Sequence, residues 1–413
     1  MGSSGTAIIV GAGVIGVTSA YALARRGWRV EIIDAGPCIA GGASKGNGRQ
    51  LSYSHTAALA SPRLLSKLPG LALGLDPAFR LSLRPDAAFA RWLVQFLSQC
   101  RRSAFVRNTV ACSLLAGESR RAMDRLLEEH ALSFRLRNAG KLVLLPDEKA
   151  RRDAERTLRL TSQSGQRQSI LSSAEAIELE PALAAFAGPL AGAIHSPEDQ
   201  TADCAEFCTQ LLGAITREYG VSFRSESEVV RIDSGHSESV VYLASGEAIP
   251  SELVVVAAGH EANRLLAPLG YHQPLAPMKG YSFTAPVGPS APRISITENA
   301  NRMVFTNLGD SMLVAGLAEL GEASGEVDPI RLEPMKRRAQ AIFPDALDYE
   351  RSDDGWAGIR PMTPNSLPVI GRLSPSLAVN VGHGMLGWTL AMGSSQRLGR
   401  MIGSPGGTPE ERC

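Results

Sequence analysis

The sequence is short of cysteine, of aromatic residues and of net charge, and each shortage excludes a class of protein. Six cysteines are scattered over 413 residues, aromatic residues make up 5%, and the formal net charge is +1. No two cysteines have the C-x-x-C spacing of zinc knuckles or dithiol redox motifs, which favours unpaired thiols in a reducing compartment. A charge this close to balance argues against a nucleic-acid partner.

The sequence also lacks the marks of membrane insertion and of a metal site. No apolar run approaches the ~18 residues that a transmembrane helix needs, and the small polar residues 1–5 lack the charged start of a signal peptide. We therefore expect no transmembrane segment, and a location in the cytoplasm, either free or held peripherally on the cytoplasmic membrane. Cys204 and Cys208 have no histidine nearby, so we expect no bound metal.

The chain is too long for one simple core, and its patterns predict two domains. We expect an α/β fold in which a discontinuous, Rossmann-like dinucleotide-binding domain comprises residues 1–85, 185–265 and 355–413. The remaining residues, 86–184 and 266–354, would form an α+β substrate-binding domain with a mainly antiparallel sheet.

A glycine-rich turn near the amino terminus lies between a predicted strand and a predicted helix. Thr6–Val10 is a short apolar run typical of a strand buried on both faces, and residues 17–26 have helical spacing. A second strand, Arg29–Ile33, ends at Asp34. A bare G-x-G-x-x-G match is weak evidence. Because residues 11–16 lie between a strand and a helix, with an acid after the next strand, they predict adenine dinucleotide binding.

Each residue of this unit has a physical role. Gly11 permits the tight turn, Gly13 lets the backbone approach a pyrophosphate, and Gly16 lets helix and strand pack closely. Asp34 would accept hydrogen bonds from the ribose hydroxyls and repel a 2′-phosphate. The alternative is a structural glycine turn capped by the aspartate. The other candidate cofactor contacts of this unit are Ala12, Val14, Ile15 and Ala35.

The segment after the acid is a second glycine-rich loop, residues 40–50. A plain NAD domain would continue here into a helix, whereas a polar loop suits a cofactor that extends past the first turn. Ser44 could bind a phosphate, and the residues from 47 to 51 could lie along a flavin ring. The alternative is a disordered surface loop. The candidate contacts in this second part are Asn47, Gly48, Gln50 and Leu51.

Dinucleotide-domain sequence returns in the middle of the chain. Residues 253–259 form an apolar run that ends in small residues, which allows close approach to a ligand, and Ala258 and Gly259 are candidate contacts. Val229 and Val230 would offer backbone groups near an adenine. Farther along, Tyr281 follows a Lys-Gly turn, and its ring could either point into a pocket or pack on the edge of a sheet.

The stretch 355–389 contains four prolines and many glycines, so its loops must approach something closely. Together with the amino-terminal unit, it carries a family likeness. The chain resembles the D-amino-acid dehydrogenases of the glycine oxidase and sarcosine oxidase superfamily, FAD-dependent enzymes, essentially from end to end. The likeness rests on residues 10–16 with Asp34, and on 47–52, 197–204, 278–282, 358–364 and 382–389.

The resemblance implies roles for several side chains. Arg360 would bind the substrate carboxylate through two parallel hydrogen bonds, assisted by Tyr281. The 382–387 loop would lie by the flavin, with the N-terminus of the next helix stabilising the reduced ring. His383 would be a loop residue near that ring, with a catalytic base as the alternative. The cofactor contacts implied here are Gly358, Arg360, Gly382, His383, Gly384, Gly387, Trp388 and Thr389.

The chain departs from its relatives at three positions. Gly358 stands where sarcosine oxidases carry the cysteine that tethers the flavin, so the FAD should be non-covalent. Asn365 and Asn307 replace an aspartate and an arginine of related dehydrogenases. Tyr53 and His55, at the mouth of the active site, would suit a small or cyclic substrate such as D-proline or cis-4-hydroxy-D-proline.

The implied reaction is oxidation of a D-amino acid by hydride transfer from Cα to flavin N5. The partners would be the amino-acid substrate and an electron acceptor, which could be a quinone, a dye or a partner protein. Three alternatives stay open: an O₂-using amine oxidase of the glycine or sarcosine type, an NAD-dependent dehydrogenase, and the flavin subunit of a multi-subunit amine dehydrogenase.

Overall fold

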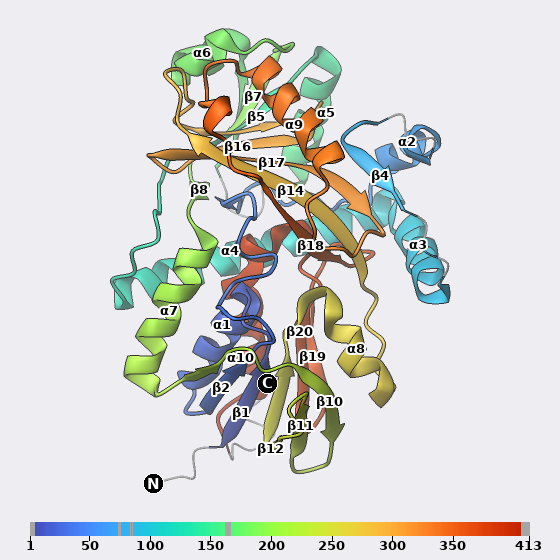
Figure 1. Cartoon of the computed structure of the whole chain (residues 1–413). Helices are drawn as coiled ribbons and strands as arrows, with labels where there is room; N and C mark the ends of the chain where they lie inside the picture. Colours follow the sequence, from blue (N-terminus) through green and yellow to red (C-terminus); the bar gives the residue numbers. More distant parts are fainter. Residues whose placement is uncertain (1–4, 73–75, 83, 85, 162–166, 406–413) are drawn as a thin grey trace.

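The computed structural model describes residues 5–72, 76–82, 84, 86–161 and 167–405. Two sheets divide the molecule, a mostly parallel one in the lower half of Figure 1 and a larger, mostly antiparallel one in the upper half. Long helices lie beside the lower sheet and extend up to the level where the halves meet. This mixture confirms the predicted α/β fold class.

The lower sheet has six strands. Its order is β19 (Val369–Ser374), β20 (Leu377–Val381), β13 (Leu253–Val256), β1 (Thr6–Val10), β2 (Arg29–Ile33) and β9 (Ser222–Arg224). All neighbouring pairs are parallel except β19 with β20. Apart from Thr6, the central strands β13 and β1 are apolar, because both faces of this sheet are covered.

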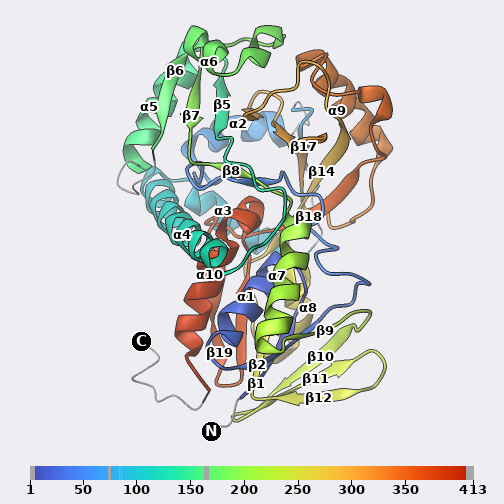
Figure 2. The same cartoon turned by 90° about the vertical axis from the view of Figure 1, so that its left-hand side faces the viewer.

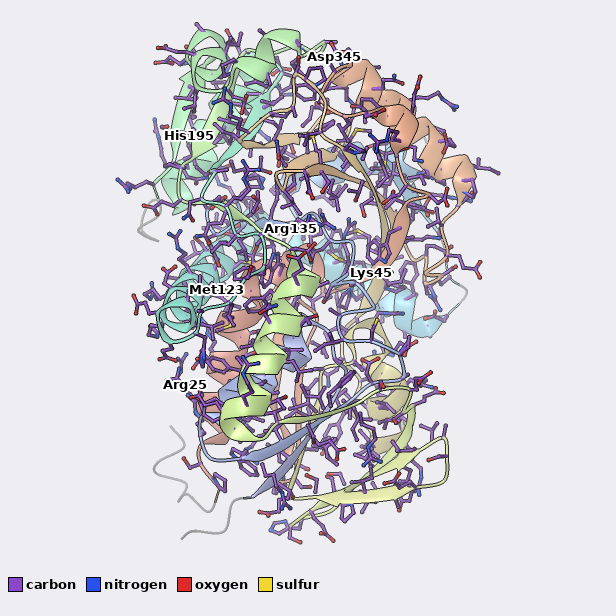
Figure 3. All side chains as sticks on the ribbon, turned by 60° about the vertical axis from the view of Figure 1, so that its left-hand side comes forward. Arg25, Lys45, Met123, Arg135, His195 and Asp345 are labelled. Atoms are coloured by element: carbon purple, nitrogen blue, oxygen red, sulfur yellow. The ribbon has the colours of Figure 1, made fainter. Side chains whose placement is uncertain are left out.

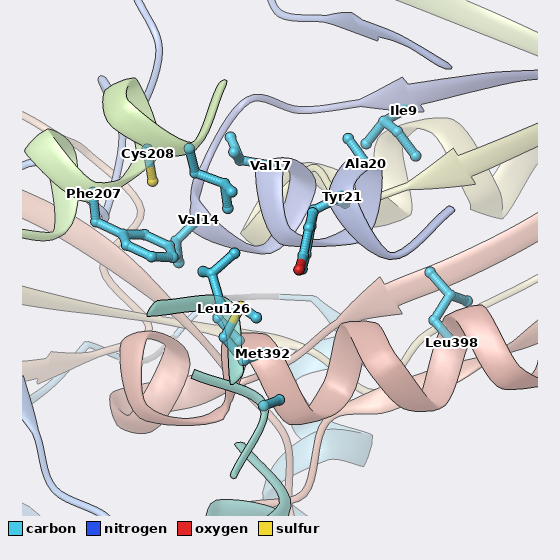
Figure 4. Packing of buried hydrophobic residues seen from close by; sticks show 14 of the residues in the cluster. Ile9, Val14, Val17, Ala20, Tyr21, Leu126, Phe207, Cys208, Met392 and Leu398 are labelled. Carbon is cyan, nitrogen blue, oxygen red and sulfur yellow. The ribbon is translucent and has the colours of Figure 1, made fainter. Parts of the chain in front are cut away.

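Successive side chains of β1 point to opposite faces of the sheet and pack on the elements that cover each face. Ala7 and Ile9 pack on helices α1 (Val14–Ala24), α7 (Cys204–Tyr219) and α10 (Gly387–Ile402). Ile8 and Val10 pack on a small antiparallel sheet of β10 (Val229–Ser234), β11 (Ser239–Leu243) and β12 (Ala248–Ser251), seen at the foot of Figure 2. Figure 4 shows side chains of α1, among them Tyr21, beside Phe207 of α7 and Met392 of α10.

The upper sheet has nine strands and is mainly antiparallel; only β15 with β5 and β17 with β4 pair in parallel. Its order is β18 (Trp356–Met362), β14 (Ala276–Pro286), β17 (Ser311–Leu320), β16 (Met303–Asn307), β15 (Ser295–Glu298), β5 (Lys141–Leu145), β7 (Gly192–Ser196) and β6 (Ser169–Ser172), with β4 (Phe79–Leu81) beside β17.

The remaining helices surround the two sheets (Figure 1), and the short one at Ala262–Leu266 packs with the lower sheet. They are α2 (Pro62–Ala72), α3 (Ala87–Gln99), α4 (Arg102–Glu129), α5 (Glu148–Thr161), α6 (Ser173–Leu179), α8 (Ala262–Leu266) and α9 (Pro329–Ile342). Short 3-10 turns span Pro181–Ala185, Gly259–Glu261, Ala267–Leu269, Tyr349–Arg351 and Gly384–Leu386. Within the described residues, no helix combines the length and apolarity needed to cross a membrane.

Two features tie the halves together. A two-residue ladder pairs β3 (Gln50–Leu51) with β8 (Gln200–Thr201). Arg135, labelled near the middle of Figure 3, forms ion pairs with Glu206 of α7 and with Asp310 of the upper half. Exposed ion pairs contribute little energy, so the short ladder and the packed helices hold the orientation of the two halves.

Some predicted bounds differ from the structure. Helix α1 begins at Val14 rather than at residue 17, because the extended backbone ends at Gly13, and it ends at Ala24. β13 ends at Val256, since the chain turns into a 3-10 helix at Gly259. The division into two domains stays a proposal. We place its boundaries at the sheets, so that β7 and β18 belong with the upper sheet rather than with residues 185–265 and 355–413.

Candidate active site

A cavity of about 1030 Å³ opens where the two halves meet. The carboxyl ends of parallel strands reach it through Val10, Ile33 and Val381, which is where open α/β sheets bind ligands. Its opposite wall comes from β14, β17 and β18 of the upper sheet, through residues such as Gly280, Leu317 and Arg360. The volume is at the upper end of the range for ligand cavities, which leaves room for a dinucleotide and a small substrate.

The glycine turn at the start of α1 has the geometry that the sequence predicts. Gly11 has φ +109°, and a methyl group there would lie 2.7 Å from the carbonyl oxygen of Ala257. A methyl group at Gly16 would lie 1.8 Å from the carbonyl oxygen of Gly11. Helix α1 therefore packs directly on the turn. Its first turn carries no acidic residue, so the positive end of its dipole faces the cavity unneutralised.

Asp34 caps the glycine turn and also faces the cavity. Its carboxylate accepts hydrogen bonds from the backbone N–H groups of Ala12, at 2.6 Å, and Gly36, at 2.7 Å, and it also lines the cavity. A carboxylate has about four acceptor sites. Asp34 can therefore hold the glycine turn and still accept hydrogen bonds from a ribose.

The glycine-rich loop that follows is ordered and forms part of the wall. Ser44 Oγ accepts a hydrogen bond from the N–H of Val14, at 3.0 Å, so it lies at the N-terminus of α1 where the sequence places a phosphate. Asn47 donates to the carbonyl of Ser44 and accepts from the N–H of Arg49. These bonds within the loop argue against a disordered surface segment.

The 382–389 segment closes the lower side of the cavity. Gly382 and Gly384 have φ of +81° and +54°, and α10 begins directly after them at Gly387. Thr389, in the first turn of α10, accepts a hydrogen bond from the N–H of Ser52 at 3.0 Å. The segment therefore joins the N-terminus of α10 to the glycine-rich loop.

His383 lies in this segment and is buried. Its Nε2 lies 2.9 Å from Ser394 Oγ, whose hydroxyl donates to the carbonyl of Ala391, so the imidazole is the donor through Nε2–H. Burial lowers the pKa of His383 to about 3. The ring is therefore neutral and a weak base, which favours the loop role over a catalytic base.

Arg360 is the most distinctive group in the wall. Its guanidinium lies flat over Gly280, where a methyl group would be 2.2 Å from a guanidinium nitrogen. Burial lowers the pKa of Arg360 to about 10, so the group stays charged at any working pH. One nitrogen donates to the carbonyl of Leu317 at 3.3 Å, and no carboxylate of the described residues forms an ion pair with it. A partly buried cation without a counter-charge favours an anionic ligand.

Tyr281 combines the two interpretations that the sequence leaves open. The residue lines the cavity, and its ring belongs to the core of the upper half. Its hydroxyl donates to Glu319, at 3.1 Å, and Glu319 is also paired with Arg331. Burial raises the pKa of Tyr281. The hydroxyl is therefore engaged by Glu319, and the ring lies under Lys279, whose ammonium is 5.1 Å from the ring centroid.

The structure places most predicted contacts on the cavity wall and five outside it. His55, Ala258, Gly358 and Trp388 are among those that line it. The five outside are Ala12, Gly16, Leu51, Tyr53 and Val230. The first two shape the glycine turn from behind, Leu51 and Tyr53 are fully buried beneath the wall, and Val230 is 45% exposed on the outward face of β10.

The two asparagines that depart from the family pattern also lie away from the cavity. Asn307 accepts a hydrogen bond from Arg137 at 2.9 Å, and Asn365 accepts one from the N–H of Leu367, which closes a turn. Gly358 does line the cavity, and a side chain there would overlap the ring of Trp356.

Four further wall residues escape prediction: Lys141, Arg302, Trp356 and Ser52. A lysine that opens the fully buried strand β5 is the one signal in the sequence that could have revealed Lys141. Arg302 is paired with Asp76 at 3.0 Å, unlike Arg360. The ring of Trp356 fits between Gly46 and Gly358, where methyl groups would overlap it. This packing explains why both positions are glycine.

The glycine turn, the acid after β2 and the N-terminus of α1, which meet at one cavity, define a dinucleotide-binding protein. The wall continues from this site along the ordered loop to the upper sheet, as an extended cofactor such as FAD requires. The chain belongs to the family of FAD-dependent oxidoreductases named DAO, whose model matches residues 6–401. The family binds FAD, which excludes the NAD-dependent alternative.

Two curated relatives match almost the whole chain. A D-amino acid dehydrogenase 2 of Ralstonia nicotianae is 38% identical over 410 residues, covering 95% of both chains. One of Pseudomonas aeruginosa is 36% identical, covering 96% of this chain and 94% of the relative.

Solved structures share the fold at lower identity. A glycine oxidase from Geobacillus kaustophilus has a TM-score of 0.70 with 24% identity, covering 95% of this chain and 93% of its own. An L-proline dehydrogenase from P. horikoshii has a TM-score of 0.71 with 20% identity, covering 99% and 96%.

Proposed function

We propose that this protein is an FAD-dependent dehydrogenase of D-amino acids. The observation that carries the proposal is the partly buried guanidinium of Arg360 in the wall of the cavity, which has no ion-pair partner among the described residues. A substrate carboxylate would supply the missing charge and accept two parallel hydrogen bonds from the planar group. The names of the two curated relatives agree with a substrate of this class.

The chain's own residues would bind and orient the substrate. Arg360 fixes the carboxylate, while Leu59, Val304 and Met362 offer an apolar wall to the side chain. Bound FAD would supply the electron acceptor, taking a hydride from Cα, while the amine, after losing its extra proton, becomes an imine. Burial lowers the pKa of His55, like that of His383, to about 3. Neither imidazole is therefore an effective proton acceptor near neutral pH. Positioning by Arg360 is therefore the main contribution of the protein.

A cyclic amino acid such as D-proline or cis-4-hydroxy-D-proline is one candidate substrate within this class. Of the two aromatic residues that suggest it, His55 lines the cavity and Tyr53 does not. We expect the FAD to be held non-covalently, because position 358 is glycine and the adjacent space is filled by Trp356. Acid precipitation of the protein should then release all of the flavin into the supernatant.

We further propose that the electrons pass to a quinone, a dye or a partner protein, and that the protein works in the cytoplasm or on the cytoplasmic membrane surface. Peroxide formation that matches substrate consumption would contradict this and favour an O₂-using oxidase. Lack of activity of the isolated chain with an artificial acceptor would favour a flavin subunit of a larger complex.

The first test is Arg360→Gln. Loss of a buried charge pair costs about 2–5 kcal/mol, so KM for a D-amino acid should rise roughly 30-fold or more. The flavin content should stay unchanged, which separates substrate binding from cofactor binding. Arg231, an exposed arginine of β10, provides the matched control, and Arg231→Gln should leave KM unchanged. An unaltered KM in Arg360→Gln would refute the assignment.

A further inference from the structure

Besides the partly buried Arg360, the cavity wall contains a fully buried cation without a carboxylate partner, Lys141. Lys141 is 4% exposed and lines the cavity. Its ammonium donates to Gln50 Oε1 at 3.0 Å and to Ser52 Oγ at 2.9 Å, both neutral acceptors. Among the described residues, none accepts its third N–H or forms an ion pair with it. Burying an ammonium in this way costs free energy unless an anion binds beside it.

The carboxylate of Asp199 acts on the charge of Lys141 through its electric field, although the two form no ion pair. Asp199 accepts a hydrogen bond from the N–H of Ser54 at 2.9 Å, and its other carboxylate oxygen is buried without a partner. Burial lowers the pKa of Lys141 to about 8, and the field of Asp199 opposes that shift. The ammonium is therefore still mainly protonated at neutral pH.

Lys141 and Arg360 serve different parts of the cavity. Arg360 is on β18 and Lys141 on β5, five strand spacings apart in the order of the sheet, roughly 24 Å measured along it. The substrate carboxylate assigned to Arg360 does not account for Lys141. Arg302, a third cation of the wall, is already paired with Asp76.

Lys141 is linked instead to the N-terminus of α10. Ser52 accepts from Lys141 through its hydroxyl and donates through its N–H to Thr389 in the first turn of α10. The positive end of the α10 dipole and the ammonium thus meet at one stretch of the wall. Both favour negative charge in the same part of the cavity.

We propose that Lys141 is a cofactor-binding residue whose ammonium stabilises the negative charge that reduction places on the flavin, with Asp199 as the counter-charge that limits this effect. The inference rests on FAD as the cofactor and not on the identity of the substrate. It assigns to Lys141 a role in setting the reduction potential, separate from the carboxylate role of Arg360.

Sulfite is a direct probe, because its sulfur lone pair forms a bond to N5 of the oxidised flavin and the π electrons of the C4a=N5 bond move into the ring as negative charge. At pH 7, Lys141→Met should weaken sulfite binding to the holoenzyme about tenfold or more. For a two-electron couple, a tenfold change corresponds to a midpoint potential about 30 mV lower. Loss of Asp199 removes the field that holds the pKa of Lys141 up, so this variant is measured at pH 6, where the lysine is more fully protonated. There Asp199→Asn should shift both quantities in the opposite direction, which general damage to the fold would not do.

Lys336 of α9 provides the control. It is paired with Glu333 and does not line the cavity, so Lys336→Met should leave both quantities unchanged. Unchanged sulfite binding in Lys141→Met, or shifts of the same sign in Lys141→Met and Asp199→Asn, would overturn the proposal. If Lys141→Met fails to retain FAD, Asp199→Asn becomes the deciding variant. Sulfite binding to Asp199→Asn that is no tighter than to the parent protein would then overturn the proposal. None of these titrations uses an amino acid, so their outcome does not depend on the proposed substrate.

Discussion

The electrostatics of individual residues distinguish this cavity from a structural void. Lys141 is buried and Arg360 partly buried, and neither cation has a carboxylate within ion-pair distance among the described residues. Both nevertheless keep their charge near neutral pH. His55 and His383 show the opposite response, since burial keeps their rings neutral. The wall therefore offers positive charge, and burial also lowers the pKa of His260, a further histidine of the wall.

The two histidines make stability depend on pH. The folded-state pKa of each is about 3, against 6.5 in the unfolded chain, so unfolding takes up protons between these values. The free energy of unfolding should therefore fall as pH drops from 6.5 toward 3, by up to about 1.4 kcal/mol per pH unit for each histidine.

Replacing one histidine should reduce this slope. His383→Gln keeps a donor for Ser394 and should lessen the loss of stability between pH 6.5 and 5 by roughly 1.5 kcal/mol. Urea unfolding at the two pH values provides the measurement. His236 is exposed, and His236→Gln should leave the slope as it is. An equal slope in His383→Gln would mean that the imidazole is not held neutral.

At the scale of single elements, the turn between β1 and α1 is the most constrained part of the molecule. Its first glycine needs a positive φ, and its last has no room for a side chain against the carbonyl oxygen of Gly11. The sequence could predict this turn because strand, glycines and acid are local. It could not predict where α1 begins, because Gly13 is compatible with either helix or extended backbone.

Gly16→Ala tests the close packing of this turn. The methyl group would meet a backbone oxygen at 1.8 Å, so α1 must shift, which costs about 1–3 kcal/mol or more. We expect lower stability and a reduced ratio of flavin to protein absorbance. Gly371→Ala, on β19 of the same sheet, meets nothing within 4 Å and should change stability by less than about 0.5 kcal/mol. A Gly16→Ala protein with full flavin content would contradict the packing argument.

For the whole molecule, the cavity exists because segments far apart in the sequence meet between the two sheets. The roles implied for Arg360 and the 382–387 loop could be stated from the sequence, since each rests on a compact motif. Lys141 and Trp356 could not, because their importance depends on neighbours such as Ser52 and Gly46, which only the fold brings close. Tyr53 is the opposite example, because it belongs to a segment expected to line the active site but does not itself line the cavity.

The central claim is that this cavity holds FAD and oxidises D-amino acids. Its most direct test is to mix the purified holoenzyme without oxygen with D-alanine, D-proline or cis-4-hydroxy-D-proline, each beside its L-enantiomer, and to follow the visible absorbance of the flavin. The account predicts bleaching by at least one D-amino acid, and markedly slower bleaching by its enantiomer. Bleaching by the L-enantiomers alone, or no bleaching across a wider panel of D-amino acids, would contradict it.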